Sequence, residues 1–190
     1  MYRVLDRGAV FGGWVGIGMA AVIVLSFELV IPLQSLVFLS APLAGLLIGY
    51  YANARSERGA GAWGHVLANA AYAGLVTGLS LALMYGAVRL LFFYADQGFQ
   101  PSGQSSVTCR SGADCTYQRY LADPASAREL RAAGVTDAAT FERYFLGQQL
   151  DGAVTLVVWT AAPAVLGGVM YAATRPRPQT AGGIPAGQAE

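Results

Sequence analysis

Four stretches of the chain are apolar over lengths that can cross a lipid bilayer. They cover residues 9–31, 33–52, 63–94 and 151–174. A spanning helix needs roughly 18 or more such residues, because it rises about 1.5 Å per residue through a hydrocarbon core of about 30 Å. The third stretch would reach about 48 Å as a helix, so it must tilt or project from one face of the membrane. The pattern predicts an all-α polytopic membrane protein with four transmembrane helices.

The first two stretches form a predicted helical hairpin. Pro32 separates them with almost no polar linker. The first stretch is too long for the apolar region of a signal peptide, and no A-x-A-like cleavage site follows it. We therefore expect it to be a retained helix.

The positions of arginine predict the orientation. Cytoplasmic loops of membrane proteins carry an excess of basic residues. Arginines flank the apolar stretches at Arg3, Arg7, Arg55, Arg58, Arg175 and Arg177. The connection between the first two stretches has none. We expect both termini and the 54–62 loop to be cytoplasmic and residues 95–150 to be extracytoplasmic, in a multi-pass protein of the inner (plasma) membrane.

The segment 95–150 carries signals for helices of its own. Asp123 and Pro124 are a typical helix start, and Gly134 is a typical stop. A second helix is predicted over 137–150, with Phe141 and Phe145 on one face. The sequence thus predicts a small helical hairpin between the third and fourth transmembrane helices. The tail 175–190 has the composition of a disordered cytoplasmic segment.

The cysteines fall in this same segment. Cys109 and Cys115 are the only two in the chain, and outside the cytoplasm such a pair usually forms a disulfide. Closing this short ring would stabilise the fold by roughly 2–2.5 kcal/mol, so we expect it to pin the start of the hairpin. A thiol-redox pair is the alternative, although the C-x-x-C spacing of catalytic thiols is absent.

Small residues recur every fourth position in the first and third stretches. Such stripes let helix backbones approach closely inside a membrane. The glycines of these stripes are Gly8, Gly12, Gly16, Gly74, Gly78 and Gly86. We expect them to pack the helices of one bundle together. The alternative is an oligomer interface or the lining of a pore.

Few polar side chains lie within the predicted helices. Glu28 and Arg89 are expected near the same membrane boundary, where they would form an ion pair or be hydrated separately. His65 and Asn69 share a helix face at the start of the third stretch, where we expect His65 to be an interfacial residue with one hydrogen bond. The alternative is that His65, Asn69 and Thr77 mark a polar pathway.

Composition and missing motifs narrow the functional classes. Only 12% of residues are charged and the net charge is +1, whereas soluble proteins average about 25% charged residues. The near-zero net charge excludes nucleic-acid binding, because no basic surplus is present to neutralise phosphates. The low share of charged residues indicates that the lipid bilayer is the main surrounding of the chain. All twelve basic residues are arginine, which is typical of a GC-rich, bacterial genome. No phosphate-binding loop, metalloprotease or serine-hydrolase motif is present, so we expect no catalytic residue, metal or cofactor.

The layout of four helices with a cysteine-bearing third loop resembles that of tetraspanins. The Cys-Cys-Gly motif of that family is absent, and Cys109 and Cys115 stand alone instead. We therefore assign no family. The leading hypothesis is a non-enzymatic structural or accessory protein that acts through a homo-oligomer or a membrane-complex partner. A small oligomeric transporter or channel and a membrane thiol-redox protein remain as alternatives.

Overall fold

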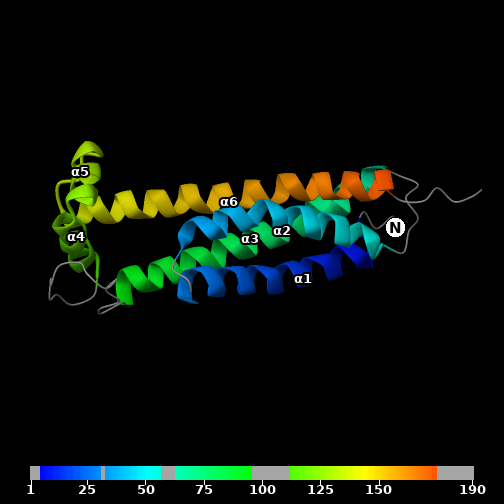
Figure 1. The fold of residues 1–190 in the computed structure, drawn as a ribbon, viewed down its shortest axis with the longest axis horizontal. Coiled ribbons are helices and arrows are strands. Elements are labelled where there is room, and N and C mark those ends of the chain that lie inside the picture. The colour runs from blue at the N-terminus through cyan, green and yellow to red at the C-terminus, as the bar shows by residue number, and fades with distance from the viewer. Residues whose placement is uncertain (1–4, 31–32, 57–62, 96–111, 175–190) are drawn as a thin grey trace, which may run out of the picture.

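The computed structural model describes residues 5–30, 33–56, 63–95 and 112–174, and every regular element within these ranges is helical. Figure 1 shows the arrangement. The helices are α1 (Arg7–Val24), which continues as the π-helix η1 (Leu25–Val30), α2 (Gln34–Ala54), α3 (Trp63–Ala95), α4 (Ala113–Ala122), α5 (Pro124–Ala132) and α6 (Ala138–Thr174). The chain is thus built of long helices with two short ones between α3 and α6.

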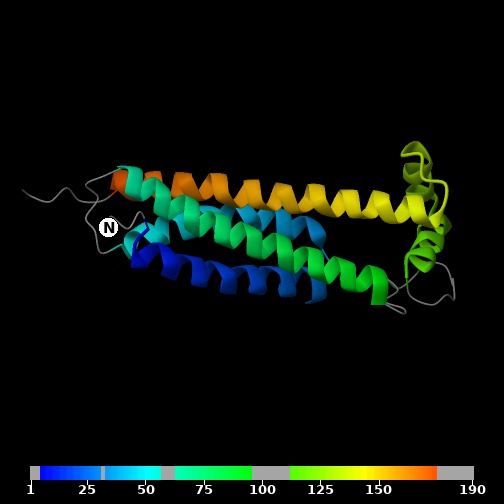
Figure 2. The same cartoon turned by 180° about the vertical axis from the view of Figure 1, so that it is seen from behind.

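Within the described ranges, four helices are long and apolar enough to cross a membrane: α1 with η1, α2, α3 and α6. Successive spans run in opposite directions along one bundle (Figures 1 and 2). Their outer faces carry large apolar side chains, such as Val30 at 77% and Leu83 at 73% exposure. Exposed apolar surface of this extent is what a helix presents to lipid, so the chain has the build of a membrane protein.

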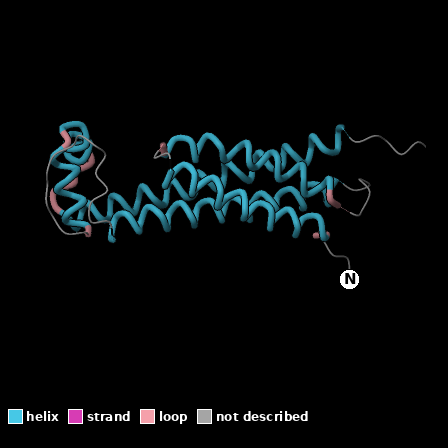
Figure 3. Tube along the Cα trace, turned by 60° about the horizontal axis from the view of Figure 1, so that its bottom comes forward, coloured by secondary structure: helices cyan, strands magenta, loops and turns pink. Residues whose placement is uncertain are grey.

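Helices α3 and α6 project beyond the hairpin of α1 and α2 at one end of the bundle (Figure 1). They have 33 and 37 residues, or about 50 and 55 Å. Helices α4 and α5 lie crosswise over these projecting ends (Figure 3). We call α4 and α5 the cap, and this end of the bundle the cap end. The long third apolar stretch therefore extends past the α1–α2 hairpin, whereas its tilt or projection relative to the membrane stays a prediction.

The boundaries of α5 follow the signals in its sequence. The Asp123 carboxylate accepts a hydrogen bond of 2.9 Å from the backbone N–H of Ser126, and Pro124 occupies the first helical turn. At the other end Gly134 has a φ of +72°, and the N–H of Val135 donates to the carbonyl of Leu130. A left-handed glycine followed by this bond is a Schellman-type helix end. The predicted start and stop of this helix are confirmed.

The structure corrects the rest of the predicted hairpin. The helix expected over 137–150 and the transmembrane helix expected over 151–174 are one continuous helix, α6. Nothing interrupts it between them, because Asp151 and Gly152 are tolerated inside a helix and no proline or side-chain cap stands there. The second short helix is instead α4, which covers residues 113–122, where no helix was predicted. The cap is therefore a hairpin of α4 and α5, one element earlier than expected.

The cap has an apolar core that ties it to the projecting helices. Phe93 of α3 and Phe145 of α6 stack with ring centroids 4.2 Å apart, and Phe141 packs on both Phe93 and Tyr117. Leu130 of α5 is 1% exposed beside them. The predicted face of Phe141 and Phe145 thus holds the cap on the bundle.

Glycines allow the spans to approach closely. A Cβ on Gly8, Gly12, Gly16, Gly74 or Gly78 would stand at 3.0 Å or less from the nearest atom of another helix or of the segment after α2, whereas Gly86 has nothing within 4 Å. Another close crossing, which the sequence did not predict, brings the backbones of α2 and α6 together. There a Cβ on Gly45 or Gly49 would collide with the carbonyl oxygen of Thr160 or Ala164. These two glycines, four residues apart, face α6 as a small-xxx-small pair.

Candidate functional site

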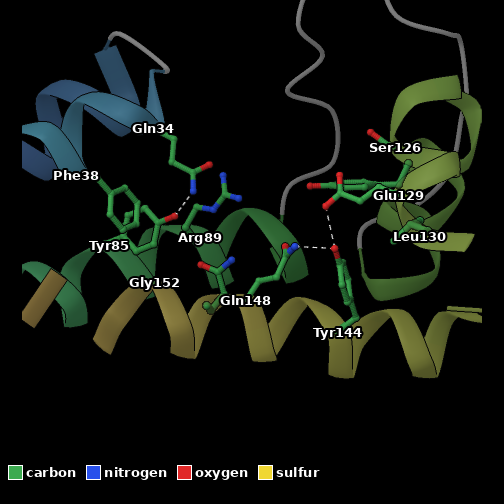
Figure 4. Close-up of a pocket in the computed structure, with 12 residues that line it drawn as sticks. Gln34, Phe38, Tyr85, Arg89, Ser126, Glu129, Leu130, Tyr144, Gln148 and Gly152 are labelled. Carbon is green, nitrogen blue, oxygen red and sulfur yellow. Dashed lines mark hydrogen bonds between the residues drawn. The ribbon is translucent and has the colours of Figure 1, made fainter. Parts of the chain in front are cut away.

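A polar pocket of about 430 Å³ lies at the cap end, between the start of α2, helices α3 and α6, and the cap (Figure 4). Its size falls within the range of about 300–1,000 Å³ of small-ligand sites. Its lining residues are Gln34, Phe38, Tyr85, Arg89, Tyr120, Ser126, Glu129, Leu130, Tyr144, Gln148, Gln149 and Gly152. Most of them carry an amide, a hydroxyl or a charge, although they stand at the end of an apolar bundle.

Two hydrogen-bond groups position the walls of the pocket. On the bundle side, the Gln34 amide donates to the Tyr85 hydroxyl. On the cap side, the Tyr144 hydroxyl donates to Glu129 at 2.9 Å and accepts from Gln148 at 2.7 Å. Figure 4 shows these two groups on opposite sides of the pocket. The second group joins α5 to α6, so the cap and the pocket are built together.

Arg89 is the cation of the pocket. Its guanidinium carbon lies 6.0 Å from the ring centroid of Tyr85 and 6.0 Å from that of Phe145. These rings hold the side chain by cation–π attraction. Its Nε is buried and has no hydrogen-bond partner among the described residues. A buried N–H of this kind requires an acceptor from water or a ligand.

Gln149 is the second unmet group. The side chain is only 9% exposed, and its buried Oε1 has no hydrogen-bond donor among the described residues. The pocket is therefore lined by two residues, one on α3 and one on α6, that each carry a buried polar atom without a hydrogen-bond partner among the described residues. This combination suits a ligand that carries both an acceptor and a donor.

The pocket does not continue into the bundle as a polar channel. Beneath Tyr85, the interior is filled by Val24, Val37, Leu81 and Leu156, each no more than 1% exposed. Such a close-packed apolar layer excludes water. The geometry is that of a recess with a closed floor.

The predicted pairing of Glu28 with Arg89 stays a prediction. Glu28 stands on η1, which continues α1 at the cap end of the hairpin. However, Glu28 Oε1 and Arg89 Nε are both buried without a hydrogen-bond partner among the described residues. The structure brings the two residues to the same end of the bundle without a hydrogen bond through these two atoms.

The residues of the predicted polar pathway lie away from this pocket. Asn69 is 2% exposed and donates to the Asp6 carboxylate at 3.0 Å, while His65 lies half-buried one turn earlier. Thr77 is fully buried against Gly16, and its hydroxyl donates to the Ala73 carbonyl of its own helix at 2.8 Å. Asn69 and Thr77 are thus packed into contacts between helices.

The Asp6 carboxylate organises the end of the bundle opposite the cap. It accepts the N–H of Ala9 at 3.1 Å as the N-cap of α1, and it also accepts hydrogen bonds from Ser56 and Asn69. Burial alone would raise the pKa of Asp6, but the hydrogen bonds outweigh it and hold the pKa below its ordinary value. We call Asp6, Ser56, Asn69 and the adjacent Asn53 the Asp6 cluster. It links the start of α1 to the segment after α2 and to α3.

The predicted disulfide cannot be placed in full. Cys115 lies in the first turn of α4 and is 3% exposed. Cys109 lies outside the described residues, so their pairing stays a prediction. Within the described ranges, no three His, Cys, Asp or Glu side chains gather in a way that could hold a metal ion.

The sequence reading overlooked most of the pocket. It singled out Arg89 alone, because charged residues within apolar stretches are conspicuous. Two signals were available: Tyr85 lies four residues before Arg89, and Tyr144 four before Gln148, spacings that place each pair on one helix face. The other walls come from α2 and α5, and no local pattern predicts that they meet.

No protein-family model matches the chain, and comparisons with curated proteins and with solved structures find no match either. The functional interpretation therefore depends on the geometry of this chain.

Proposed function

We propose that the chain is a non-enzymatic integral membrane protein that acts as a structural or accessory subunit, through protein contacts made by its cap. The observation that carries the proposal is the cap itself. Helices α3 and α6 project beyond the α1–α2 hairpin, and α4 and α5 are fastened there by an aromatic core. A folded element held beyond the spans is suited to meeting a second protein.

The composition of the cap supports this role. Arg128, Glu129 and Arg131 of α5 are exposed, and charged groups at the rim of an interface direct association and exclude wrong partners. The spans expose apolar side chains instead, which suit lipid. The two parts of the molecule are thus fitted to different surroundings.

The proposed setting is the plasma membrane, with the cap on the extracytoplasmic side. Arg7 and Arg55 lie at the end opposite the cap, where the positive-inside rule favours the cytoplasm. In this orientation Cys109 and Cys115 would meet an oxidising compartment and form a disulfide. An impermeant maleimide added to intact cells should label a cysteine introduced by Arg131→Cys, and one introduced by Ala54→Cys only after permeabilisation. The reverse labelling would contradict the orientation.

Site-specific photo-crosslinking in intact cells tests the proposed role. A photoreactive amino acid replaces Arg128 or Arg131 in the cap, and in control variants it replaces the outward-facing Leu39 or Leu83 of the spans. We expect a discrete cross-linked protein from the cap positions and lipid adducts from the controls. Absence of a cap adduct would contradict the proposal.

A flux measurement separates this role from transport. The apolar layer below the pocket favours a bundle that is closed to ions and polar solutes. Liposomes that contain the purified protein should therefore leak ions no faster than empty liposomes. Sustained ion or solute flux would replace the accessory role with the transporter or channel alternative.

A further inference from the structure

We infer that the pocket at the cap end binds the headgroup of a zwitterionic phospholipid, with the phosphate at Arg89 and the ammonium group toward Glu129. This goes beyond the proposed function, since a cap that meets no partner protein can still hold a lipid. The inference stands on the cavity, on its unmet polar atoms, on its charges and on the apolar surface around it.

The lining residues Arg89 and Gln149 favour a ligand with both an acceptor and a donor. Arg89 Nε lacks an acceptor, and Gln149 Oε1, on a side chain nine-tenths buried, lacks a donor. Both residues line the same cavity. A phosphate offers oxygens to the guanidinium, for which arginine has the matching geometry. An ammonium group offers hydrogens to the amide oxygen.

The start of α2 strengthens the anion side of the pocket. Gln34, the first residue of α2, lies beside Arg89 in Figure 4. The N-cap residue of this 21-residue helix is Leu33, which provides no side-chain hydrogen bond. An uncapped helix N-terminus carries partial positive charge and exposed N–H groups, which favour a phosphate.

The remaining charges favour a ligand that brings its own cation. Glu129 lines the cap side of the pocket, and Glu28 stands on η1 at the same end of the bundle. Two carboxylates therefore accompany one guanidinium at this end. A headgroup with a net negative charge would be repelled, whereas phosphoethanolamine places its ammonium group where a carboxylate already stands.

The surface around the pocket favours a lipid over a soluble phosphate compound. Beside Gln34 and Phe38, the hairpin exposes Leu33 at 52% and Leu39 at 65%. On the α6 side, Val154 is 55% exposed. In a membrane such side chains touch acyl chains, so a molecule with a polar head and apolar tails meets both surfaces at once.

Native mass spectrometry of the full-length, delipidated protein in mild detergent tests the inference. The probes are dioctanoyl phosphatidylethanolamine, dioctanoyl phosphatidylglycerol, soluble phosphoethanolamine and inorganic phosphate. We expect saturable binding of the phosphatidylethanolamine, with a Kd at least about fivefold lower than that of phosphatidylglycerol. The two soluble probes should not bind.

Two variants assign the two ends of the headgroup. Arg89→Gln should weaken binding of both lipids by about tenfold or more, because it removes a charge-assisted contact. Glu129→Gln should weaken only phosphatidylethanolamine and abolish the preference between the lipids. Because Glu129 is exposed, this second variant should fold even if Arg89→Gln does not. The matched controls Arg143→Gln and Glu142→Gln lie outside the pocket lining and should bind as the parent does.

Three results would overturn the inference. Equal retention of both lipids by the parent and by every variant would indicate annular lipid only. Binding of phosphoethanolamine or inorganic phosphate as tightly as the lipid would assign the pocket to a soluble phosphate compound. Absence of saturable binding would leave the cavity as a hydrated recess.

Discussion

The two ends of the bundle use their charged side chains in opposite ways. At the end opposite the cap, the Asp6 carboxylate accepts three hydrogen bonds from within the chain and joins α1, α3 and the segment after α2. At the cap end, Arg89 lies over two rings and lines a cavity of about 430 Å³, and its buried Nε has no hydrogen-bond partner among the described residues. Polar groups in this apolar bundle therefore stabilise the fold where the chain satisfies their hydrogen bonds. Where the chain leaves those hydrogen bonds unmade, the polar groups mark a candidate ligand site.

Substitutions at the end of the bundle opposite the cap should lower the free energy of unfolding more than substitutions at the cap end. Gly49→Val would drive a side chain into the carbonyl oxygen of Ala164, and backbone there has no room to yield. We expect a loss of about 3 kcal/mol in the free energy of unfolding, at the upper end of the usual cost of overpacking, seen as a large fall in melting temperature in detergent. Gly18→Val is the matched control, because Gly18 has nothing within 4 Å, and it should stay within about 0.5 kcal/mol of the parent. Equal effects of the two substitutions would refute the close crossing of α2 and α6.

Loss of the Asp6 carboxylate should weaken the same end by a smaller amount. Asp6→Ala removes a helix cap and two side-chain hydrogen bonds, so we expect a loss of about 1–3 kcal/mol in unfolding free energy. Asp137→Ala, which removes the exposed N-terminal cap of α6, controls for capping alone and should cost about 1 kcal/mol. Equal unfolding temperatures for the two variants would show that the hydrogen bonds of Asp6 with Ser56 and Asn69 add no stability beyond the helix cap.

The Asp6 cluster also predicts an acid dependence. Its hydrogen bonds hold the pKa of Asp6 below the ordinary value of 3.8. A carboxyl with a lowered folded-state pKa contributes stability that is fully present above the unfolded pKa, and this contribution disappears as the pH falls through the folded pKa. The stability difference between the parent and Asp6→Ala should therefore be constant at neutral pH and shrink below about pH 4. Thermal unfolding of both proteins between pH 7 and pH 3 measures it.

What the sequence predicts here depends on the range of the interactions. The four spans and the boundaries of α5 are local: they follow from runs of apolar residues and from Asp123, Pro124 and Gly134. The continuity of α6 is also local, but it was missed because a short amphipathic pattern beside a long apolar one resembles two helices.

The sequence does not predict the pocket, for a different reason. Gln34, Arg89 and Glu129 are far apart along the chain and meet only when the hairpin stops short of α3 and α6 and the cap folds over them. Arg89 was conspicuous because a charge within an apolar helix is rare. Gln149 was not, because a glutamine in a polar stretch signals nothing until its burial is known.

Two buried amides, one at each end of the bundle, should respond differently to replacement by leucine. Asn53 of the closed end is 1% exposed and donates to the carbonyls of Gly49 and Val66 at 3.0 and 3.1 Å. Asn53→Leu removes both bonds and should cost about 1–3 kcal/mol of unfolding free energy.

Gln149 of the cap end is also buried, at 9% exposure, but its Oε1 accepts no hydrogen bond from the described residues. Gln149→Leu therefore removes an acceptor that the protein does not satisfy, and replacing such a group by an apolar one of similar size is neutral or stabilising. We expect its unfolding temperature in lipid-free detergent to equal or exceed that of the parent. Because the same oxygen would receive the ammonium group of a bound headgroup, added phosphatidylethanolamine should stabilise the parent more than Gln149→Leu. If Gln149→Leu lost as much stability as Asn53→Leu in the absence of lipid, the Gln149 amide would belong to a satisfied hydrogen-bond network. The two ends of the bundle would then not differ in how their buried amides are satisfied.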